Sequence, residues 1–357
     1  MSTAPTISII IPAYNAAGFI EECLQHIVPQ MGPGHEVIVI DDGSRDDTAA
    51  RVQAVAAAAP HCALHLVQQA NQGLAEVRNV GLRHARGDYI LFIDCDDLLQ
   101  AGMLARLDAV IDSHRPDAIA VDFRMWQPDR PHKDRDVHMS YPKDTLIDDQ
   151  DLILERFFID RHLYAWARII RRDIYASFPP PLYPTGRLFE DVAVTPRLLA
   201  RCRTLYYLPQ VLLAYRQHPV SITRVITPQW CIDFVSALAL VKPEFERAGV
   251  SAAVRRRFDE TACHFYIGLV KNSYQLPAAL GKTVRQQVKG IFLGSLFDPP
   301  QQVLDGMRAN KRSQRDRRTA RQVQRALCDS WLFNLEQSAV RKLKLWQRMR
   351  RTRASQA

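Results

Sequence analysis

The sequence predicts an α/β fold, in which a mostly parallel sheet is flanked by helices and followed by a helical C-terminal region. In the first 125 residues, short apolar runs alternate with longer segments of helical pattern. Nearly continuous apolar runs are typical of strands buried on both faces, as in a parallel sheet. The expected strands are Ile7–Ile11, Val37–Ile40, Ala63–Val67, Tyr89–Ile93 and Ala118–Phe123. The expected helices are Ala16–Val28, Asp46–Ala58, Leu74–Ala85 and Met103–His114.

The rest of the chain divides into three segments of different composition. Residues 124–146 are rich in Pro, Asp, Arg and His and are expected to form a loop. Residues 147–227 mix short helical and strand patterns, and from Pro228 onward the pattern is helical. With 357 residues the chain is long for one average domain. We therefore expect one α/β domain over residues 1–227 and a helical region over residues 228–357.

The positive charge is concentrated near the C-terminus. Residues 308–353 contain 15 Lys and Arg but only 3 Asp and Glu, a net charge of +12. The formal charge of the whole chain is +9, so the remainder carries −3. The tail and the body are therefore expected to have different partners.

Cysteine usage and hydropathy indicate the cellular compartment in which the protein is expected. The seven cysteines are scattered and form no C-x-x-C pair, which argues against a disulfide framework and a cysteine zinc site. The N-terminus lacks the basic region and long apolar core of a signal peptide. No stretch approaches the roughly 18 apolar residues of a membrane-spanning helix. We expect a cytoplasmic protein that is soluble or peripherally attached to a membrane.

Polar residues cluster directly after three of the expected strands. They are Pro12–Asn15, Asp41–Ser44 and Asp94–Asp97. Parallel α/β sheets bind ligands at the carboxyl ends of their strands. These three clusters therefore predict a single binding site.

Asp94 and Asp96 form a D-x-D pattern at the end of an apolar strand. On an extended strand, residues two apart point the same way, so two carboxylates can converge on one hard cation. Mn²⁺ or Mg²⁺ held there would neutralise charge on a departing diphosphate. A solvated acidic turn is the alternative for an arbitrary D-x-D, but the position after a buried strand favours the metal site.

Two further residues near these clusters are candidates for nucleotide binding. Asp42 can accept hydrogen bonds from a base or ribose, whereas Asp46 and Asp47 are typical of a helix start. Arg78, on the expected helix after Asn71, can reach a nucleotide or its phosphates. A structural ion pair is an equal alternative for Arg78.

The second half of the expected domain supplies the remaining candidates. A carboxylate of Glu190 or Asp191 could act as a general base, although the pair alone is also a helix-start pattern. Arg216 and His218 could hold diphosphate oxygens, or could belong to a surface loop. Trp166 could form a platform for an acceptor, or could belong to the core.

Together these segments resemble family-2 glycosyltransferases of the GT-A fold, a Rossmann-like α/β fold. The resemblance is greatest to the bacterial enzymes that build capsular polysaccharide and exopolysaccharide. It covers about residues 6 to 225, and seven segments share order and spacing with the family. They are Ser8–Asn15, Val39–Ser44, Asn71–Leu74, Gly87–Asp97, Trp166–Arg172, Phe189–Asp191 and Tyr215–Thr223.

The resemblance implies a role for each matching residue. The first half, about residues 1–125, would bind the nucleotide, and the second, about residues 126–227, the acceptor. On the donor side, the residues that would line the nucleotide pocket are Pro12, Ala13 and Tyr14. Asp42 would bind the base, usually uracil. Asp94 would face the ribose side, and Asp96 would hold the metal. Asp191 would be the catalytic base, with Glu190 beside it helping to hold the donor or acceptor.

The reaction implied is hexosyl transfer by an inverting single displacement. An α-linked nucleotide-diphosphate sugar, usually of UDP, would give a β-linked product on a saccharide acceptor in bacterial cell-surface polysaccharide synthesis. Processive synthases of the family carry a Q-x-x-R-W motif and membrane helices, and this sequence has neither. Addition of a single sugar is therefore expected.

The basic tail lies outside the resemblance. Apolar residues recur there at helical spacing, at Leu332, Leu335, Ala339, Leu343 and Trp346. A basic amphipathic helix can lie on an anionic membrane, here the inner face of the plasma membrane, where a lipid-linked oligosaccharide acceptor would be found. An ordinary helix packed on the body is an equal alternative. Nucleic acid is not an expected partner, because no aromatic interleaving or known module accompanies the basic residues.

Two other functional classes remain open from the sequence. A nucleotidyltransferase could also use metal-binding aspartates on an α/β sheet, but it should carry a Gly-rich phosphate loop where Pro12–Asn15 stand. A catalytically inactive sugar-nucleotide-binding subunit should have lost the D-x-D or the Glu-Asp pair, and both are present. A dehydrogenase is excluded because no G-x-G-x-x-G follows the first strand.

Overall fold

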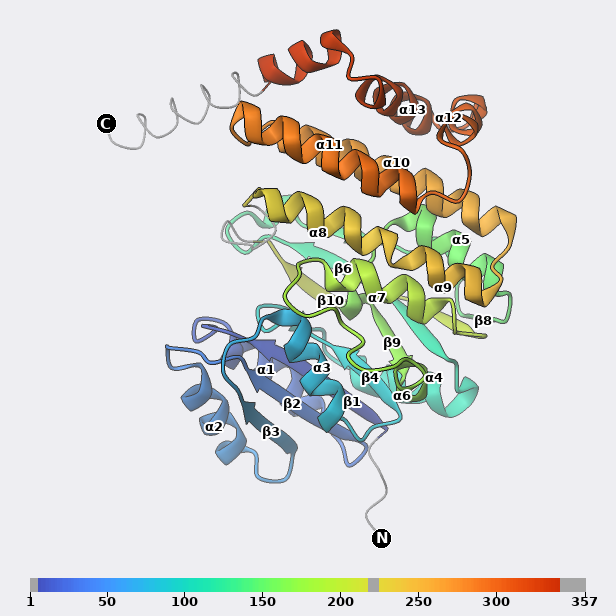
Figure 1. Ribbon diagram of the computed structural model, residues 1–357. Helices are drawn as coiled ribbons and strands as arrows, with labels where there is room; N and C mark the ends of the chain where they lie inside the picture. Colours follow the sequence, from blue (N-terminus) through green and yellow to red (C-terminus); the bar gives the residue numbers. More distant parts are fainter. Residues whose placement is uncertain (1–5, 218–224, 341–357) are drawn as a thin grey trace. The chain divides into compact units, whose positions relative to one another are not determined.

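The computed structural model describes residues 6–217 and 225–340. The chain divides into two compact units, Met1–Ser221 and Ile222–Ala357. In Figure 1 the strands belong to the first unit, and the second unit consists of helices. Each unit is described below by itself.

The first unit is built on a ten-stranded mixed sheet. The strand order is β3-β2-β1-β4-β9-β6-β10-β5, with β7 paired to β6 and β8 paired to β10. All five strands expected from the sequence are present, as β1, β2, β3, β4 and β6. The strands are β1 (Ile7–Ala13), β2 (His35–Asp41), β3 (Ala63–Gln68), β4 (Tyr89–Phe92), β5 (Leu98–Leu99), β6 (Ala118–Trp126), β7 (Arg135–Val137), β8 (Thr145–Ile147), β9 (Arg168–Arg171) and β10 (Leu205–Arg216).

The four helices expected in the first 125 residues are also present. The helices of this unit are α1 (Ile20–Ile27), α2 (Thr48–Ala58), α3 (Leu74–His84), α4 (Met103–His114), α5 (Gln150–Asp160), α6 (Arg172–Ala176) and α7 (Glu190–Leu199). Helix α3 packs against β1 and β2. Gly81 permits this close approach, because a Cβ there would lie 2.3 Å from Cγ2 of Ile10.

Parallel pairing is interrupted by β9. Strand β1 pairs in parallel with β2 and β4, β2 with β3, and β6 with β10. Strand β9 lies between β4 and β6 and is antiparallel to both. Its central residues Ile169 and Ile170 are buried, which suits a strand covered on both faces. The sheet is therefore parallel on either side of β9, which is inserted antiparallel from later in the chain.

The prediction of a loop over residues 124–146 is partly wrong. Strand β6 continues to Trp126, and β7 and β8 form short antiparallel pairs with β6 and β10. The Nε of Arg124 donates to Oδ1 of Asp136 at 2.7 Å, joining β6 and β7 through polar side chains. Short strands with exposed charged residues give little apolar pattern, which is why composition indicated a loop.

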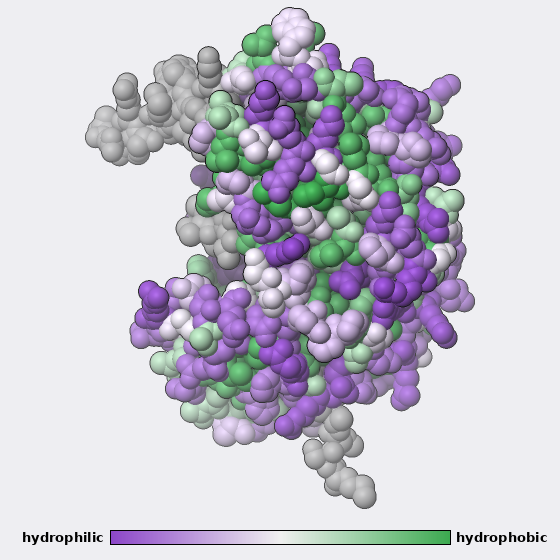
Figure 2. Space-filling view, viewed as in Figure 1, coloured by the Kyte–Doolittle hydropathy of each residue, from purple (hydrophilic) through white to green (hydrophobic). Residues whose placement is uncertain are grey.

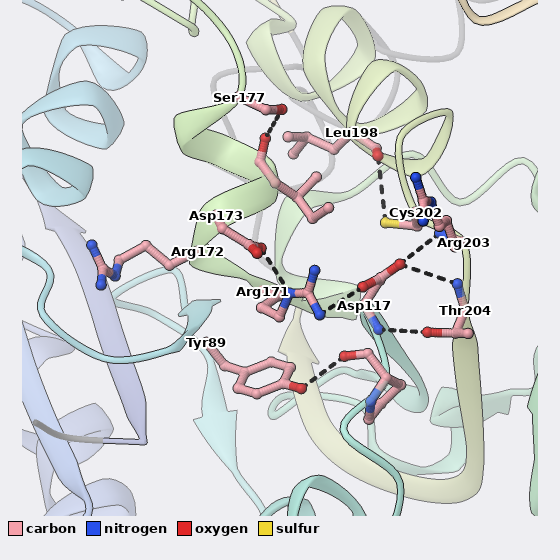
Figure 3. Close-up of polar contacts among 12 residues, drawn as sticks. Tyr89, Asp117, Arg171, Arg172, Asp173, Ser177, Leu198, Cys202, Arg203 and Thr204 are labelled. Atoms are coloured by element: carbon pink, nitrogen blue, oxygen red, sulfur yellow. Dashed lines mark hydrogen bonds and ion pairs between the residues drawn. The ribbon is translucent and has the colours of Figure 1, made fainter.

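A network around Asp117 holds β9 in place at the end of the sheet where β4, β6 and β10 begin (Figure 3). Oδ1 of Asp117 pairs with Nη1 of Arg171 at 3.1 Å. Oδ2 accepts the backbone N–H groups of Arg203, at 2.6 Å, and Thr204, at 3.2 Å. Nearby, the Tyr89 hydroxyl donates to the Pro116 carbonyl at 2.8 Å. The carboxylate of Asp117 thus joins three strands.

We expect Asp117→Ala to lower the free energy of unfolding by about 3 kcal/mol, because it leaves two backbone donors and Arg171 without their shared acceptor. Chemical denaturation of the purified chain measures this value. Asp173→Ala is the matched control. The Asp173 side chain is 62% exposed and accepts from Nε of Arg171. The control should change stability by less than about 1 kcal/mol. Equal losses in the two variants would contradict this role for Asp117.

The second unit consists of helices as far as it is described. They are α8 (Pro228–Ala239), α9 (Val241–Ala248), α10 (Ala252–Ser273), α11 (Ala278–Ser295), α12 (Pro300–Ala309), α13 (Gln314–Leu327) and a further helix over residues 331–340. Helix α11 packs against α8 and α10. None of the helices in the described part of the chain is long and apolar enough to cross a membrane. On the face shown in Figure 2, hydrophilic residues cover most of the surface and hydrophobic ones reach it in small patches.

Candidate functional site

The loops that follow β1 and β2 are tied to each other by hydrogen bonds. The backbone N–H of Asn15 donates to Oγ of Ser44 at 2.9 Å, and that of Ala16 to Oγ1 of Thr48 at 2.8 Å. Oδ2 of Asp46 accepts the backbone N–H of Ala17 at 3.0 Å. Asp46 also accepts the Thr48 N–H at 3.1 Å, so it supports the start of α2 as expected. The two strand ends thus form one rigid edge.

Pro12, Ala13 and Tyr14 lie at this edge. Pro12 and Ala13 are the buried last residues of β1, and the Ala13 carbonyl accepts the Asp42 backbone N–H at 2.9 Å. Tyr14 is 49% exposed, so its ring is available to a ligand. Of these three residues, Tyr14 offers the accessible side chain.

Asp42 is buried and its carboxylate is engaged by the loop after β3. Oδ1 accepts Nε2 of Gln69 at 2.7 Å and the backbone N–H of Gln72 at 2.9 Å. Oδ2 accepts the backbone N–H of Gly73 at 2.8 Å. In this structure Asp42 therefore organises the Gln69–Gly73 loop, and base binding by Asp42 would have to use its remaining acceptor capacity.

The D-x-D pattern lies in a turn rather than on an extended strand. Strand β4 ends at Phe92, and the backbone N–H of Asp97 donates to the Asp94 carbonyl at 3.0 Å. The sequence argument from strand alternation was therefore wrong in detail, because the chain reverses here to enter β5. The turn still gathers Asp94, Asp96 and Asp97 at the carboxyl end of β4.

Arg78 connects the D-x-D turn to the Glu-Asp pair. Its Nη2 lies 3.3 Å from Oδ1 of Asp94, and its Nη1 forms an ion pair with Oε1 of Glu190. The Arg78 side chain is only 3% exposed and Glu190 is 5% exposed. The ion-pair alternative thus describes Arg78 in this structure, and contact with a donor stays a prediction. Glu190 is likewise directed to Arg78 and not to solvent.

The carboxylates of the site raise one another's pKa. Burial, together with the charges of Asp96 and Asp191, raises the pKa of Asp94 to about 6, although Arg78 acts in the opposite direction. Burial raises the pKa of Asp191, and burial with the neighbouring aspartates raises that of Asp97. Since Asp94 feels the charges of both Asp96 and Asp191, the turn and the start of α7 belong to one site.

Arg216, at the end of β10, also lies at the D-x-D turn. Its Nε donates to the Asp96 carbonyl at 2.8 Å, and its backbone N–H donates to Oδ1 of Asp97 at 2.8 Å. The guanidinium pairs with Glu22 and lies 4.3 Å from the centre of the Trp126 ring. Arg216 is thus at the predicted site, where it supports the turn. His218 lies outside the described residues.

Trp166 does not offer an open platform. It is 3% exposed and stacks on Tyr164, with ring centres 4.7 Å apart and planes 8° apart. Neighbouring rings cover the indole, as the core alternative expects, and its acceptor role stays a prediction. Tyr164 and Tyr215, which sequence reasoning missed, are half-buried. After burial, the charge of Asp191 contributes most to raising the pKa of Tyr164, so this ring lies near the Glu-Asp pair.

The D-x-D turn fits a divalent cation. Among residues 6–217 and 225–340, no group of three or more His, Cys, Asp or Glu side chains is placed to hold a metal by itself. Mg²⁺ is commonly held by one or two carboxylates together with phosphate oxygens and water. The buried Oδ2 of Asp97 has no hydrogen-bond partner within the described chain. Burial raises the pKa of Asp94, and the negative charge of Asp96 adds to this effect. A bound cation would offset that charge, with Asp94 and Asp96 as the carboxylates able to hold it.

We expect Arg78→Met to lower the free energy of unfolding by about 3 kcal/mol, because Asp94 and Glu190 lose their shared counterion. Adding Glu190→Gln should restore part of the loss, since one uncompensated charge is removed. Arg83→Met, on the same helix, is the control: Arg83 is 59% exposed and should contribute less than about 1 kcal/mol. Urea unfolding of the four proteins measures these differences. A double variant that is less stable than Arg78→Met would contradict the role of Arg78 as shared counterion of Asp94 and Glu190.

His162 makes the first unit sensitive to acid. Burial and the nearby Arg168 and Arg135 lower its pKa to about 4. An unfolded histidine titrates near about 6.5, so the folded state loses stability as pH falls from there toward 4. His162→Phe keeps the ring contact with Phe123. Unfolding at pH 7 and pH 5 should show a smaller loss for the variant, by about 1 kcal/mol after allowing for solvent exposure. Equal losses would contradict this origin.

The sheet carries a D-x-D turn joined to a Glu-Asp pair, and comparisons with known proteins find glycosyltransferases. Residues 8–178 match the family model described as Glycosyl transferase family 2. An uncharacterized glycosyltransferase of Bacillus subtilis (strain 168), EpsJ, is 28% identical over 226 residues, which is 62% of this chain and 64% of that protein. Over residues 8–178 the chain is therefore similar to glycosyltransferase family 2.

Solved structures share the fold. Residues 1–349 of S. aureus TarS, in complex with UDP-GlcNAc, superpose with a TM-score of 0.69 at 20% identity, covering 96% of this chain and 92% of that one. The mannosyltransferase PcManGT from Pyrobaculum calidifontis, in complex with GDP-Man and Mn²⁺, gives a TM-score of 0.52 at 18% identity, covering 96% and 88%. Because both identities are low, these likenesses establish the fold alone.

Proposed function

We propose that the chain transfers a sugar from a nucleotide-diphosphate donor to a saccharide acceptor, with inversion and with Mn²⁺ or Mg²⁺. The observation that supports this proposal most is the position of Arg78 between Asp94 and Glu190. These two carboxylates are far apart in the sequence. It brings a candidate metal-binding turn and a candidate base into one site. The complexes of the two solved neighbours with UDP-GlcNAc and GDP-Man support a nucleotide-sugar donor.

In the proposed mechanism, Asp191 accepts the proton of the attacking acceptor hydroxyl. Its carboxylate is more basic than that of a free aspartate because burial raises its pKa, which brings it nearer to the working pH of a general base. Its Oδ1 accepts the Val192 backbone N–H at 2.8 Å, so the side chain is held at the start of α7. A divalent cation bound by Asp94 and Asp96 would stabilise the diphosphate leaving group.

Arg78 and the two tyrosines support this arrangement. Arg78 holds Asp94 and Glu190 in place through its two ion pairs. We propose that Tyr14 borders the donor and that Tyr164, near Asp191, borders the acceptor. The transferase domain is proposed to be residues 1–227, and residues 228–357 to be a separate helical region.

A screen of nucleotide sugars tests the proposed function. UDP- and GDP-linked sugars, each with and without Mn²⁺, would be added to the full chain, and the thermal midpoint measured. We expect at least one donor to raise the midpoint only when Mn²⁺ is present, and EDTA to reverse the effect. That donor should then be hydrolysed slowly to nucleoside diphosphate. Stabilisation by nucleoside triphosphates with release of diphosphate would instead indicate a nucleotidyltransferase.

We further propose that the basic tail docks on an anionic membrane carrying a lipid-linked acceptor. Three apolar side chains of the helix over residues 331–340 support this, since Trp331, Leu332 and Leu335 are 67%, 51% and 59% exposed. Ala339 is exposed on the same helix, and Leu343 and Trp346 lie outside the described residues. The net charge of +12 over residues 308–353 complements an anionic surface.

Flotation with anionic liposomes tests the tail. The full chain should float, and Leu332→Ser/Leu335→Ser should not, because the change removes apolar area while keeping every charge. Thr283→Ser/Gln287→Ser, exposed on α11, is a control that should float like the parent. Equal flotation of the apolar variant and the parent would exclude this role.

A further inference from the structure

The helical unit contains a pocket that the proposed transferase chemistry does not use. Its volume is about 140 Å³, and it is lined by residues of α10, α11, the end of α13 and the helix over residues 331–340. Every lining residue belongs to the second unit. The pocket is therefore a feature of the helical unit by itself.

One wall of the pocket carries three cationic side chains. Lys282, Arg285 and Lys289 follow one another on α11 at spacings of three and four residues, which places them on one face of the helix. Asp329 is the one acidic residue of the lining, so the lining carries three positive charges against one negative charge. Oδ1 of Asp329 accepts Nδ2 of Asn334 at 2.9 Å. The pocket thus has an excess of positive charge.

These cations are not neutralised by acidic side chains. Within residues 6–217 and 225–340, no ion pair joins Lys282, Arg285 or Lys289 to a carboxylate. Nζ of Lys289 donates to the Leu327 carbonyl at 2.6 Å, and Nη1 of Arg285 donates to Oγ of Ser273 at 3.3 Å. A lysine has three N–H donors and an arginine five, so both retain donors for a ligand.

Aromatic rings in the pocket lining fix the position of Arg285. Its guanidinium lies 4.1 Å from the centre of the Tyr274 ring. The Tyr274 hydroxyl donates to Oδ1 of Asn334, and Tyr266 and Phe333 are 2% and 1% exposed. A cation held against rings in a concave site attracts an anion more strongly than one in open solvent. Arg285 is therefore already oriented for an anionic ligand.

We propose that this pocket binds the phosphate group of a phosphomonoester. A tetrahedral oxyanion can accept from the Arg285 fork and from two ammonium groups at once, which matches the donors of this wall. The phosphate could be carried by a soluble sugar or polyol phosphate or by a lipid headgroup, and the chemistry recognised is the same. This inference is independent of the proposed function, because it uses no residue of the transferase site.

Two phosphomonoester probes test the proposal on the full chain in EDTA, which removes divalent cations from the transferase site. Glycerol 3-phosphate represents the soluble source and is titrated calorimetrically. Vesicles containing phosphatidic acid in phosphatidylcholine represent the lipid source. The variant is Lys282→Gln/Lys289→Gln. The control, Lys133→Gln/Lys143→Gln, removes the same charge at exposed positions outside both the pocket and the basic tail.

We expect at least one probe to bind the parent, and the pocket variant to bind it at least about tenfold more weakly while the control stays within about twofold. Binding should also weaken as salt is added. Binding of glycerol 3-phosphate that the pocket variant loses would identify a soluble ligand. If only vesicle binding is lost in the pocket variant, the ligand is a lipid headgroup, because vesicle binding through the basic tail would be kept. Should Lys289→Gln impair folding, seen as a lower thermal midpoint, Lys282→Gln alone gives the same comparison because Lys282 is exposed.

The proposal is overturned if neither probe binds, or if the pocket variant and the control lose affinity equally. Donor binding with Mn²⁺ is measured on the same variants and should be unchanged. A chain that binds Mn²⁺ and a nucleotide sugar but neither probe would leave the proposed function standing and reject the pocket.

Discussion

Asp96→Asn should reduce glycosyl transfer by about a thousandfold or more and remove the Mn²⁺-dependent part of donor binding. The substitution keeps the size of the side chain and removes the charge that a cation would meet. An effect of this size corresponds to about 4 kcal/mol of transition-state stabilisation. Initial rates with the donor found by thermal shift, over a range of Mn²⁺ concentrations, measure the loss.

The stability of this variant should move in the opposite direction to its activity. The charge of Asp96 raises the pKa of both Asp94 and Asp97, so removing it relieves repulsion in a buried turn. The unfolding midpoint should therefore stay the same or rise. Asp88→Asn, the same change at an exposed position before β4, is the control and should retain full activity. An Asp96→Asn enzyme with normal Mn²⁺ dependence would remove the metal assignment.

Asp191→Asn should lower kcat by about a hundredfold to ten-thousandfold and leave donor affinity nearly unchanged. A general base contributes in the transition state and little to binding of the donor, so the loss should appear in kcat rather than in the donor KM. The asparagine Oδ1 can still accept the Val192 N–H, and the fold should be preserved. Steady-state kinetics with calorimetric donor binding separate the two quantities.

A matched control distinguishes this role from a general effect of an acidic helix start. Asp173 lies in the first turn of α6, as Asp191 does in α7, and its side chain is 62% exposed. Asp173→Asn should be fully active. If Asp191→Asn retained near-normal turnover, the proton acceptor would have to be another group of the site.

The sequence alone placed five strands (β1, β2, β3, β4 and β6) and the four early helices correctly. This was possible because each buried strand needs a run of apolar residues and each helix needs an apolar stripe, and both patterns are local. It also placed polar residues after β1, β2 and β4, which the structure finds as neighbours in the sheet. Strand β9 could not be positioned in this way, because Arg168–Arg171 are too short to indicate which strands they pair with.

The sequence identified the candidate side chains of the site by their chemical type, but it did not identify the residues they contact. The sequence does not distinguish an arginine that contacts a phosphate from one that neutralises two carboxylates. Only the structure shows that Glu190 approaches Arg78. The same holds for Trp166, since neighbours from β6 and β10 cover its ring. Tyr164 was missed because one aromatic residue beside another carries no local signal.

The sequence by itself determined the α/β class, the order of its early elements and the residue types available for chemistry, because these follow from short-range pattern and composition. Tertiary structure decided which charges meet. The Arg78 bridge, the turn that gathers Asp94, Asp96 and Asp97, and the cationic wall of α11 all depend on segments packing together. Burial then alters the pKa values and binding properties of groups that would behave alike in solution.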